Sequence, residues 1–450
     1  MGSTAAVRTE DGHRPHRQVP AMLKVGFIGF GGGSALIPVL EKELVTPHGG
    51  LTEKTFVQDT VIANITPGAL PVKIAALSGI QLGGPVLATA SAVAVALPGA
   101  AITVALLAFF AALGPDAIRI VEYASLGITA FILYLLAHYV AKVIRTSGHR
   151  RHVYVAIAIA AFLLTGADKT VGLVSEVAGV EQPFTVPELS ALGLILAAIA
   201  GIALVSVIER IRFGRQRFEE HPEEPAGLKR TLAGVAVLAG LTVVSVLAAV
   251  LLGPAPENGS FLGLITFSTL SSFGGGEAYV GVADGFFVAP GLVESSVFYG
   301  QVVPVANALP GPILVKIASG LGYVVGFDLA GPALGAVLAS AAFLASIGAC
   351  SALALGVLAG YDKARHSLFV RNIASFILPV ICGLLASTSV SMLHSNAAIG
   401  AEAGVPPVLI VGGTIAVAAA VPLVHRLARV PDVLIIVACG ALSLALLAAL

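Results

Sequence analysis

Long apolar stretches, separated by short polar or charged ones, follow one another along almost the whole chain. About 20 apolar residues allow an α-helix to cross the hydrocarbon core of a bilayer. On this rule the pattern predicts about 13 segments, of which the first two and their later counterparts, the eighth and ninth, are the least regular. The predicted segments are residues 22–45, 56–83, 84–113, 118–144, 151–167, 188–208, 231–253, 260–288, 296–326, 331–358, 368–393, 405–425 and 431–450. The pattern therefore predicts an all-α integral membrane protein.

Composition supports a membrane protein and excludes several other classes. Hydrophobic residues occupy 57% of the 450 positions and charged residues 11%, whereas a soluble domain is about one quarter charged. The 25 basic and 25 acidic side chains balance, so we expect no nucleic-acid partner. Cys350, Cys382 and Cys439 all lie in apolar stretches and are interpreted as small core residues. We expect neither a metal site nor a cofactor.

Basic residues gather in alternate loops, which predicts the orientation of the chain. The amino-terminal tail, residues 1–20, is basic and has no apolar stretch, so it does not resemble a signal peptide. If this tail is cytoplasmic, the basic loops around Arg150, at 209–230, around Lys363 and around Arg426 are also cytoplasmic, as the positive-inside rule requires. We therefore predict a multi-pass protein of the bacterial inner (cytoplasmic) membrane, with the lipid bilayer as a partner and the carboxyl terminus outside.

Two motifs each occur twice in the chain. The first reads Phe30-Gly31-Gly32-Gly33 and Phe273-Gly274-Gly275-Gly276. The second reads Asn64-Ile65-Thr66-Pro67-Gly68 and Asn307-Ala308-Leu309-Pro310-Gly311. Both pairs are separated by 243 positions, and Lys73 and Lys316 share this separation. A common register for Asn, Pro and Lys indicates an internal duplication.

The segment count predicts how the two copies are arranged. Residues 21–210 form the first repeat, and residues 254–450 form the second. A charged cytoplasmic loop at 211–230 and a linking transmembrane helix at 231–253 lie between them. An odd number of crossings between equivalent segments makes the repeats inverted, as in many transporters with a site near the membrane midplane.

The glycine motif predicts a break in each first segment. Each glycine costs about 1 kcal/mol relative to Ala in a helix, and a break exposes backbone groups that lipid cannot satisfy. Such a break is expected to face protein or a water-filled cavity, where it acts as a hinge or lets the backbone approach an ion. The alternative is close helix packing through small residues.

The Asn-x-x-Pro-Gly motif predicts the start of a new half-helix. Asn is a good amino-terminal cap and Pro suits the first helical position. Free N–H groups and the helix dipole make such a start a site for anions. Lys73 and Lys316 lie six residues beyond the prolines and can reach back toward the break. They are candidate substrate or ion-pair residues, and the alternative is snorkelling toward the lipid headgroups.

Three acidic residues are candidates for coupling. Glu41 and Asp284 follow the glycine motifs by eight residues, and Glu277 lies directly beside the second motif. They could carry protons or pair with a lysine, although solvated loop charges are the commoner interpretation for Glu41 and Asp284 at segment ends. The sequence has no catalytic motif or metal-ligand spacing that we can recognise, so we do not expect an enzyme.

These motifs carry a family resemblance from about residue 21 onward. Phe-Gly-Gly, a following acid and Pro310-Gly311-Pro312, duplicated along a long chain, resemble the two-domain form of the chromate ion transporter family. The first copy departs from the pattern, because it reads Pro67-Gly68-Ala69. The resemblance implies a secondary transporter that exports chromate, an oxyanion similar to sulfate, driven by an ion gradient or by anion exchange.

The sequence thus predicts an oxyanion site between the two Asn-x-x-Pro-Gly breaks, which face one another near the midplane. The expected substrate-binding residues are Asn64, Pro67, Gly68, Lys73, Asn307, Pro310, Gly311 and Lys316. A homodimer is compatible with the sequence. The alternatives are a transporter or channel for another small solute, and a membrane scaffold or sensor that does not transport.

Overall fold

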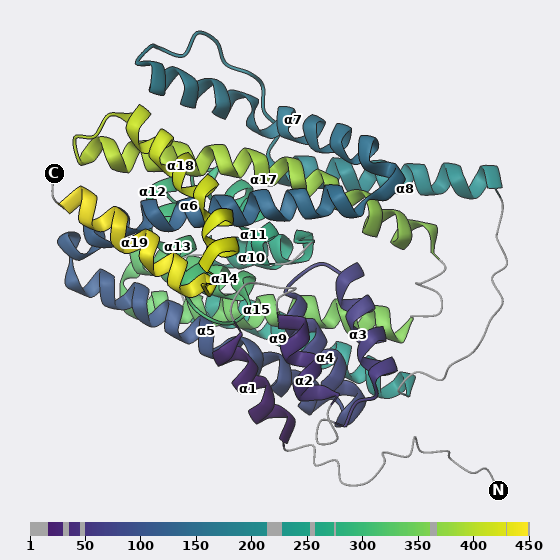
Figure 1. Ribbon diagram of the computed structural model, residues 1–450. Helices are drawn as coiled ribbons and strands as arrows, with labels where there is room; N and C mark the ends of the chain where they lie inside the picture. Colours follow the sequence, from purple (N-terminus) through teal and green to yellow (C-terminus); the bar gives the residue numbers. More distant parts are fainter. Residues whose placement is uncertain are drawn as a thin grey trace, which may run out of the picture.

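The computed structural model describes residues 17–29, 36–45, 50–213, 227–252, 257–273, 276–360, 367–428 and 430–448, and all its regular elements in these ranges are helices (Figure 1). The first half contains α1 (Gln18–Ile28), α2 (Ile37–Leu44), α3 (Glu53–Ile65), α4 (Leu70–Leu82), α5 (Pro85–Leu113), α6 (Pro115–Thr146), η3 (Gly148–Arg150), α7 (Arg151–Ala178) and α8 (Ala191–Phe213). Next come α9 (Leu228–Leu252), α10 (Glu257–Ser271), α11 (Gly276–Ala283), the π-helical turn η4 (Asp284–Val288), α12 (Ser295–Val297), the π-helical turn η5 (Phe298–Val302) and α13 (Val303–Ala308). The chain ends with α14 (Ile313–Ala330), α15 (Pro332–Ala359), α17 (Leu368–Glu402), α18 (Pro407–Ala428) and α19 (Asp432–Ala448).

The predicted all-α membrane fold is confirmed. Nine of the described helices are long and apolar enough to cross a membrane. Some boundaries were predicted wrongly. The fifth predicted segment ends at residue 167, but α7 continues to Ala178, so Lys169 lies inside a helix and not in a loop.

Both irregular segments of the first repeat are helical hairpins. Lys24 on α1 and Glu43 on α2 form an ion pair of 2.6 Å, although a single helix would place residues 19 positions apart roughly 28 Å from each other. Gln81 on α4 donates a hydrogen bond of 2.5 Å to Asp59 on α3, 22 positions away. The chain therefore turns back within each of these segments.

The second repeat folds in the same way. The ring centroids of Phe267 on α10 and Phe286 in η4 lie 6.0 Å apart. These two residues occupy the positions equivalent to Lys24 and Glu43. Gly320 on α14 packs against Val302 in η5, because a Cβ added at Gly320 would lie 3.0 Å from a methyl group of Val302. Each repeat therefore begins with two hairpins. If both hairpins enter and leave the membrane on one side, the parity of the crossings, and hence the predicted sidedness, is unchanged.

Equivalent elements of the two repeats keep the spacing of the motifs. α3 ends at Ile65 and α13 at Ala308, while α4 begins at Leu70 and α14 at Ile313, and each pair is 243 residues apart. The four helices α5 to α8 correspond in order to α15, α17, α18 and α19.

The equivalent helices α5 and α15 run in opposite directions. Gly99 and Leu107 of α5 pack against Lys316 and Gly320 of α14, in that order, so α5 and α14 are parallel. α15 returns along α14 after the single turn residue Gly331, so these two are antiparallel. It follows that α5 and α15 are antiparallel, as an inverted arrangement of the repeats requires.

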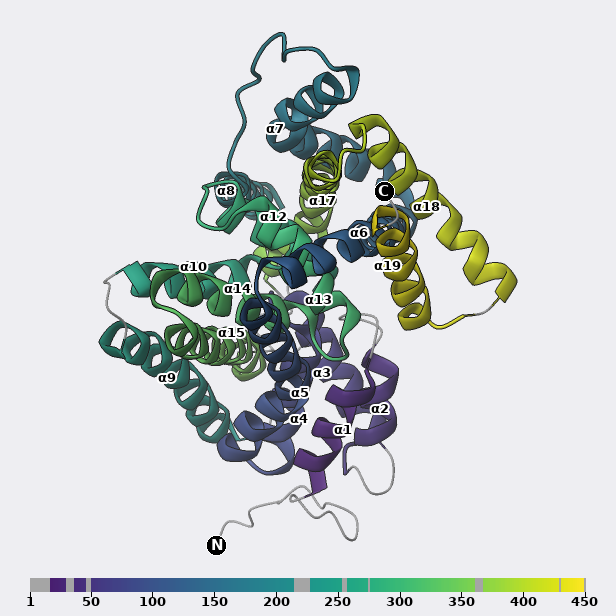
Figure 2. The same ribbon diagram turned by 90° about the vertical axis from the view of Figure 1, so that its left-hand side faces the viewer.

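The helices form two bundles, and each bundle contains helices from both repeats (Figure 2). One bundle holds α1 to α5 with α9, α10, α14 and α15, and the other holds α6 to α8 with α17 to α19. In the second bundle, helices of each repeat pack mainly against a helix of the other repeat. α7 and α8 of the first repeat pack on α17, while α18 and α19 of the second pack on α6.

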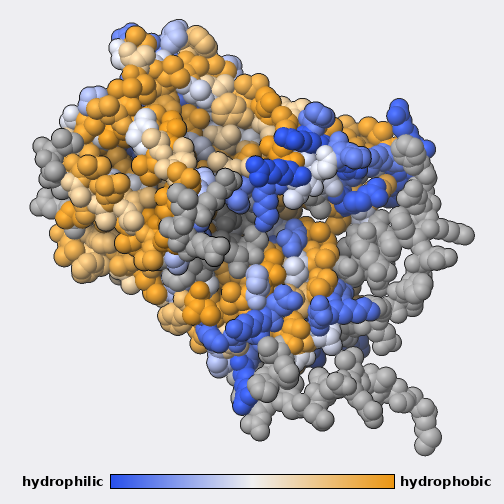
Figure 3. Space-filling model, in the orientation of Figure 1, coloured by the Kyte–Doolittle hydropathy of each residue, from blue (hydrophilic) through white to orange (hydrophobic). Residues whose placement is uncertain are grey.

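The surface separates into an apolar part and a polar edge (Figure 3). Hydrophilic residues gather on the right-hand side of the view, where α8 ends in Figure 1, while hydrophobic residues dominate the remaining visible surface. Large aliphatic side chains such as Val86, Ile211 and Leu251 are almost fully exposed. Lipid is the solvent in which such a surface is stable.

Candidate functional site

The two Pro-Gly breaks have the same backbone geometry. Thr66 and Leu309 are extended, with φ/ψ of −100°/146° and −103°/152°. Gly68 and Gly311 have φ of +101° and +94°, a left-handed conformation that favours glycine. Gly68 is restricted further, because a Cβ there would lie 2.2 Å from the Cβ of Cys350.

Each break is tied to the opposite repeat by one backbone hydrogen bond. The Gly68 N–H donates to the Ser272 carbonyl at 2.7 Å, and the Gly311 N–H donates to the Gly29 carbonyl at 2.7 Å. Ser272 and Gly29 are themselves equivalent residues just before the two glycine motifs. The Pro-Gly break of each repeat thus meets the end of the first helix of the other repeat, an arrangement that the sequence prediction missed.

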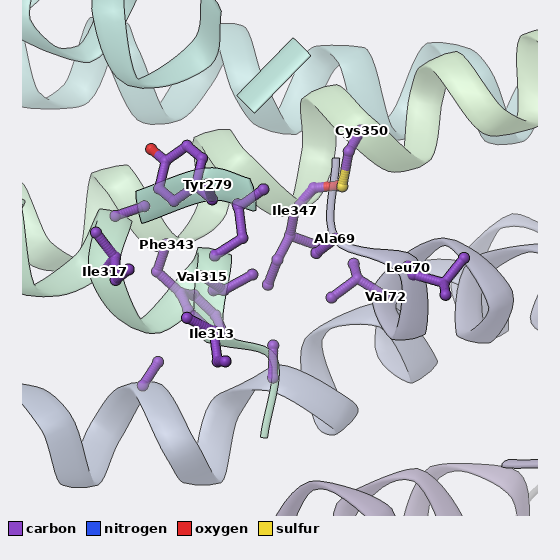
Figure 4. Close-up of a cluster of buried hydrophobic side chains, with 14 of the residues drawn as sticks. Ala69, Leu70, Val72, Tyr279, Ile313, Val315, Ile317, Phe343, Ile347 and Cys350 are labelled. Atoms are coloured by element: carbon purple, nitrogen blue, oxygen red, sulfur yellow. The ribbon is translucent and has the colours of Figure 1, made fainter. Parts of the chain in front are cut away.

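The breaks bring the starts of α4 and α14 to the same buried region. In Figure 4, Leu70 and Val72 lie on one side of Ile347 of α15, and Ile313 and Val315 lie on the other. No side chain caps either helix in the described part of the chain. The first backbone N–H groups of a helix have no partner within the helix, and both starts are buried. The result is two buried regions of positive potential that no side chain caps among the described residues.

The predicted capping role of the asparagines is wrong. Asn64 lies in the last turn of α3 and donates to the Thr60 carbonyl at 2.7 Å, and Asn307 lies in α13 and donates to the Val303 carbonyl at 2.8 Å. The new helices begin later, at Leu70 and Ile313.

The predicted position of the prolines is also wrong. Pro67 and Pro310 lie in the turn, three residues before the first helical position of α4 and α14. The first helical residue follows Ala69 in one repeat and Pro312 in the other, and both of these are extended.

Both lysines turn back toward their own break. Lys73 Nζ donates to the Ala63 carbonyl at 2.6 Å and also to the Thr66 carbonyl, and Lys316 Nζ donates to the equivalent Leu309 carbonyl. Each lysine is 1% exposed, so neither snorkels to a headgroup region. The Nζ atoms bind carbonyls at the ends of α3 and α13, so both amino groups lie inside the hairpins.

The glycine motifs are described only in part. Phe30, Gly31, Gly32, Gly33, Gly274 and Gly275 lie outside the described residues. Phe273 is buried, and Gly276 begins α11 at a point where a Cβ would lie 2.8 Å from the Cβ of Ile313. The second motif therefore touches the start of α14, while Ser272 just before it binds the break that precedes α4.

The three acidic candidates differ in their surroundings. Glu41 is exposed on α2, and the side chain of Glu277 lies outside the described residues. Asp284 is buried at the start of η4, and its Oδ2 atom lies 3.0 Å from Lys169 Nζ. Its Oδ1 atom accepts a hydrogen bond of 2.7 Å from the Tyr299 hydroxyl.

Sequence reasoning missed the partners of Asp284. Lys169 also donates to the Ser391 hydroxyl at 2.9 Å, so the cluster joins α7 and α17 of one bundle to η4 and η5 beside the other. Tyr299 and Ser391 carried no signal in the sequence. Lys169 would have been noticed if the apolar pattern of α7 had been followed past residue 167, because an intramembrane lysine usually has a partner.

Comparison with known proteins identifies the family. A family model described as "Chromate transporter" matches residues 18–180 and 261–444. The chain belongs to the chromate transporter family. The two matched stretches begin 243 residues apart, the spacing of the hairpins and breaks, so the chain has the two-domain form of this family.

The curated relatives of this chain are themselves called transporters. The chain is 34% identical over 87 residues to the "Uncharacterized transporter YwrB" of Bacillus subtilis (strain 168), covering 19% of this chain and 44% of the relative. It is 36% identical over 64 residues to the "Uncharacterized transporter YwrA" of the same organism, covering 14% and 36%. The chain thus spans less than half the length of these relatives. No solved structure matches.

Proposed function

We propose that the protein is a secondary active transporter that exports chromate, or a sulfate-like dianion, across the bacterial inner membrane by alternating access. An ion gradient or anion exchange drives the export. The anion binds between the starts of α4 and α14. The observation that carries this proposal is that both helix starts border one cluster of buried side chains (Figure 4) and have no side-chain cap in the described part of the chain.

The chemistry of the site favours an anion. A buried N–H group without an acceptor costs several kcal/mol, and oxyanion oxygens supply acceptors for several such groups. Lys73 and Lys316 place an Nζ donor at each break, and in the protonated form each adds positive charge near a helix start. Ser272 adds a buried hydroxyl that has no hydrogen-bond partner among the described residues. These donors suit a tetrahedral dianion better than a neutral or cationic solute.

The inverted repeats suit alternating access. Because α5 and α15 run in opposite directions, the two halves can exchange conformations and open the site to either side. The basic loops support a cytoplasmic amino terminus. One chain supplies both repeats, so we assign transport to the monomer. A homodimer would place two such sites side by side, and light scattering of the purified protein measures its mass.

The test is oxyanion flux in oriented proteoliposomes with Lys316→Ala. A hydrogen bond to a charged group contributes about 1.5–3 kcal/mol, so we expect a roughly tenfold to hundredfold loss of chromate flux at limiting substrate. Lys316→Met keeps most of the side-chain volume and should show the same loss. Unlabelled sulfate competition defines the substrate class. Wild-type flux in both variants, at equal reconstitution, would contradict the anion site.

A further inference from the structure

One buried carboxylate in the α3–α4 hairpin makes no ion pair with a basic residue in the part of the chain that the structure describes. Asp59 is 0% exposed, and its Oδ1 atom accepts a hydrogen bond of 2.5 Å from Gln81 Nε2. Its Oδ2 atom has no hydrogen-bond partner among the described residues. An ionised carboxylate in such surroundings carries a desolvation penalty of several kcal/mol. Protonation of Asp59 removes this penalty.

The second repeat provides an internal control for the role of this pair. The positions equivalent to Asp59 and Gln81 are Val302 and Val324, 243 residues further along. Val302 packs inside the second hairpin against Gly320, so the equivalent position is also internal there. The same hairpin thus forms with two valines. The acid and the amide are absent together, as expected for two residues that act as a unit, and the fold does not require them.

Asp59 lies between the solvent and the candidate anion site. Gln81 is in the last turn of α4, at the base of the hairpin, and is partly exposed. Asp59 is about one helical turn before Ala63, whose carbonyl binds the Lys73 ammonium group near the tip of the hairpin. Gln81 and Asp59 therefore lie nearer the base of the hairpin, and the Lys73 Nζ atom lies nearer its tip. The predicted sidedness places the base at the cytoplasmic face.

Other titratable groups occur on the elements that pack against α3, but none of them makes a hydrogen bond or ion pair with Asp59 among the described residues. These groups are Glu41, Lys42 and Glu43 on α2, Lys73 on α4, Cys350 on α15, and Arg371, His394 and Glu402 on α17. The protonation state of Asp59 therefore depends mainly on burial and on Gln81.

We propose that Asp59 is a proton-binding site that couples proton movement to oxyanion transport. The proposal rests on the proposed function. One proton adds to the carboxylate to give a neutral carboxyl group, and its release restores the anion, so no other reactant is needed. A proton suits this site because metal cations such as Mg²⁺ and Ca²⁺ take about six or more oxygen ligands.

The experiment compares wild type with Asp59→Asn and with the double variant Asp59→Val/Gln81→Val in proteoliposomes. The double variant copies the second repeat and should fold, and Asp59→Asn is nearly isosteric. Two assays separate coupling from transport. Chromate counterflow, in which labelled substrate exchanges with unlabelled, requires no net proton movement. Chromate accumulation under an imposed pH gradient, with a trapped pH-sensitive dye, reports coupled proton flux.

We expect both variants to keep counterflow within about twofold of wild type and to lose acceleration by the pH gradient and substrate-dependent proton flux. Unchanged proton-coupled accumulation in Asp59→Asn would overturn the coupling role. Wild-type counterflow without any response to the pH gradient, or accumulation driven by Na⁺ instead, would overturn it too while leaving the proposed function intact. Absence of counterflow in wild type would instead contradict oxyanion transport itself.

Discussion

Removing either partner of the Lys169–Asp284 pair should destabilise the protein, but by unequal amounts. The Asp284 side chain is 3% exposed and the Lys169 side chain 25%. Lys169→Met leaves a buried carboxylate whose remaining side-chain donor among the described residues is the Tyr299 hydroxyl. Asp284→Asn leaves an ammonium group that keeps Ser391 and reaches solvent. The lysine variant therefore leaves the more costly charge.

The structure sets the size of this difference. Breaking a buried pair by removing one partner costs about 3–5 kcal/mol, and the range applies to Lys169→Met because Asp284 is buried. Losing hydrogen bonds to a charged group costs about 1.5–3 kcal/mol, which is the estimate for Asp284→Asn. The double variant removes both charges, so it should be more stable than Lys169→Met alone, with a coupling of about 0.5–3 kcal/mol.

Thermal unfolding in detergent measures these differences. The chain has no tryptophan, so a maleimide dye that fluoresces on reaction with thiols is the better reporter. Cys350 and Cys382 are buried and react only when the protein opens. The expected order of unfolding temperature is wild type, then Asp284→Asn, then the double variant and Lys169→Met, with Lys169→Met lowest. Equal losses in the two single variants, or a double variant less stable than Lys169→Met, would refute the reasoning.

Two further predictions concern the hairpins. Gly68→Ala should reduce the yield of monodisperse protein far more than Gly311→Ala, because a Cβ at the first position would lie 2.2 Å from Cys350 and at the second 3.4 Å from its nearest neighbour. Cys350→Gly should partly rescue Gly68→Ala, and equal effects of the two alanines would contradict the packing. Single cysteines at Thr52 and Leu82, in a background without native cysteines, should react with an impermeant maleimide from the same side of oriented vesicles. Labelling from opposite sides would show that α3 and α4 cross the membrane as one segment, and a cysteine in the loop between α7 and α8 serves as the control for the other face.

The repeat and the class of fold could be predicted from the sequence because they depend on local composition and on a shared register. Apolar length predicts membrane helices, and the 243-residue spacing of Asn64 and Asn307 predicts equivalent elements. Whether a broken segment crosses or turns back could not be predicted. Composition is the same in both cases, and the answer depends on contacts such as Gln81 with Asp59, which join distant positions.

The candidate site was predicted in its location but not in its details. Lys73 was expected to reach back, and the tilt of helical side chains explains that expectation. Its partners are backbone carbonyls that have no partner within α3 because the helix ends at the break. Backbone carbonyls occur at every residue, so no residue pattern predicts which ones are free. The assignment of Asn64 as a cap failed because Asn64 belongs to α3, and the four residues from Thr66 to Ala69 separate the end of α3 from the next helix. Asp59 was overlooked because a single acid beside polar residues looks like an ordinary surface charge.

The exchange of contacts between repeats has a consequence for biosynthesis. The Gly68 N–H cannot bind the Ser272 carbonyl until the ribosome has reached Ser272, which takes roughly ten to forty seconds at about 5–20 residues per second. During that time α6 also lacks α18 and α19, and α7 and α8 lack α17. The newly made amino-terminal half therefore lies in the membrane without the hydrogen bond at its break and without the helices that cover its helix faces in the folded protein. The insertion machinery, or a membrane chaperone, is expected to cover these helix faces until the second repeat has been inserted.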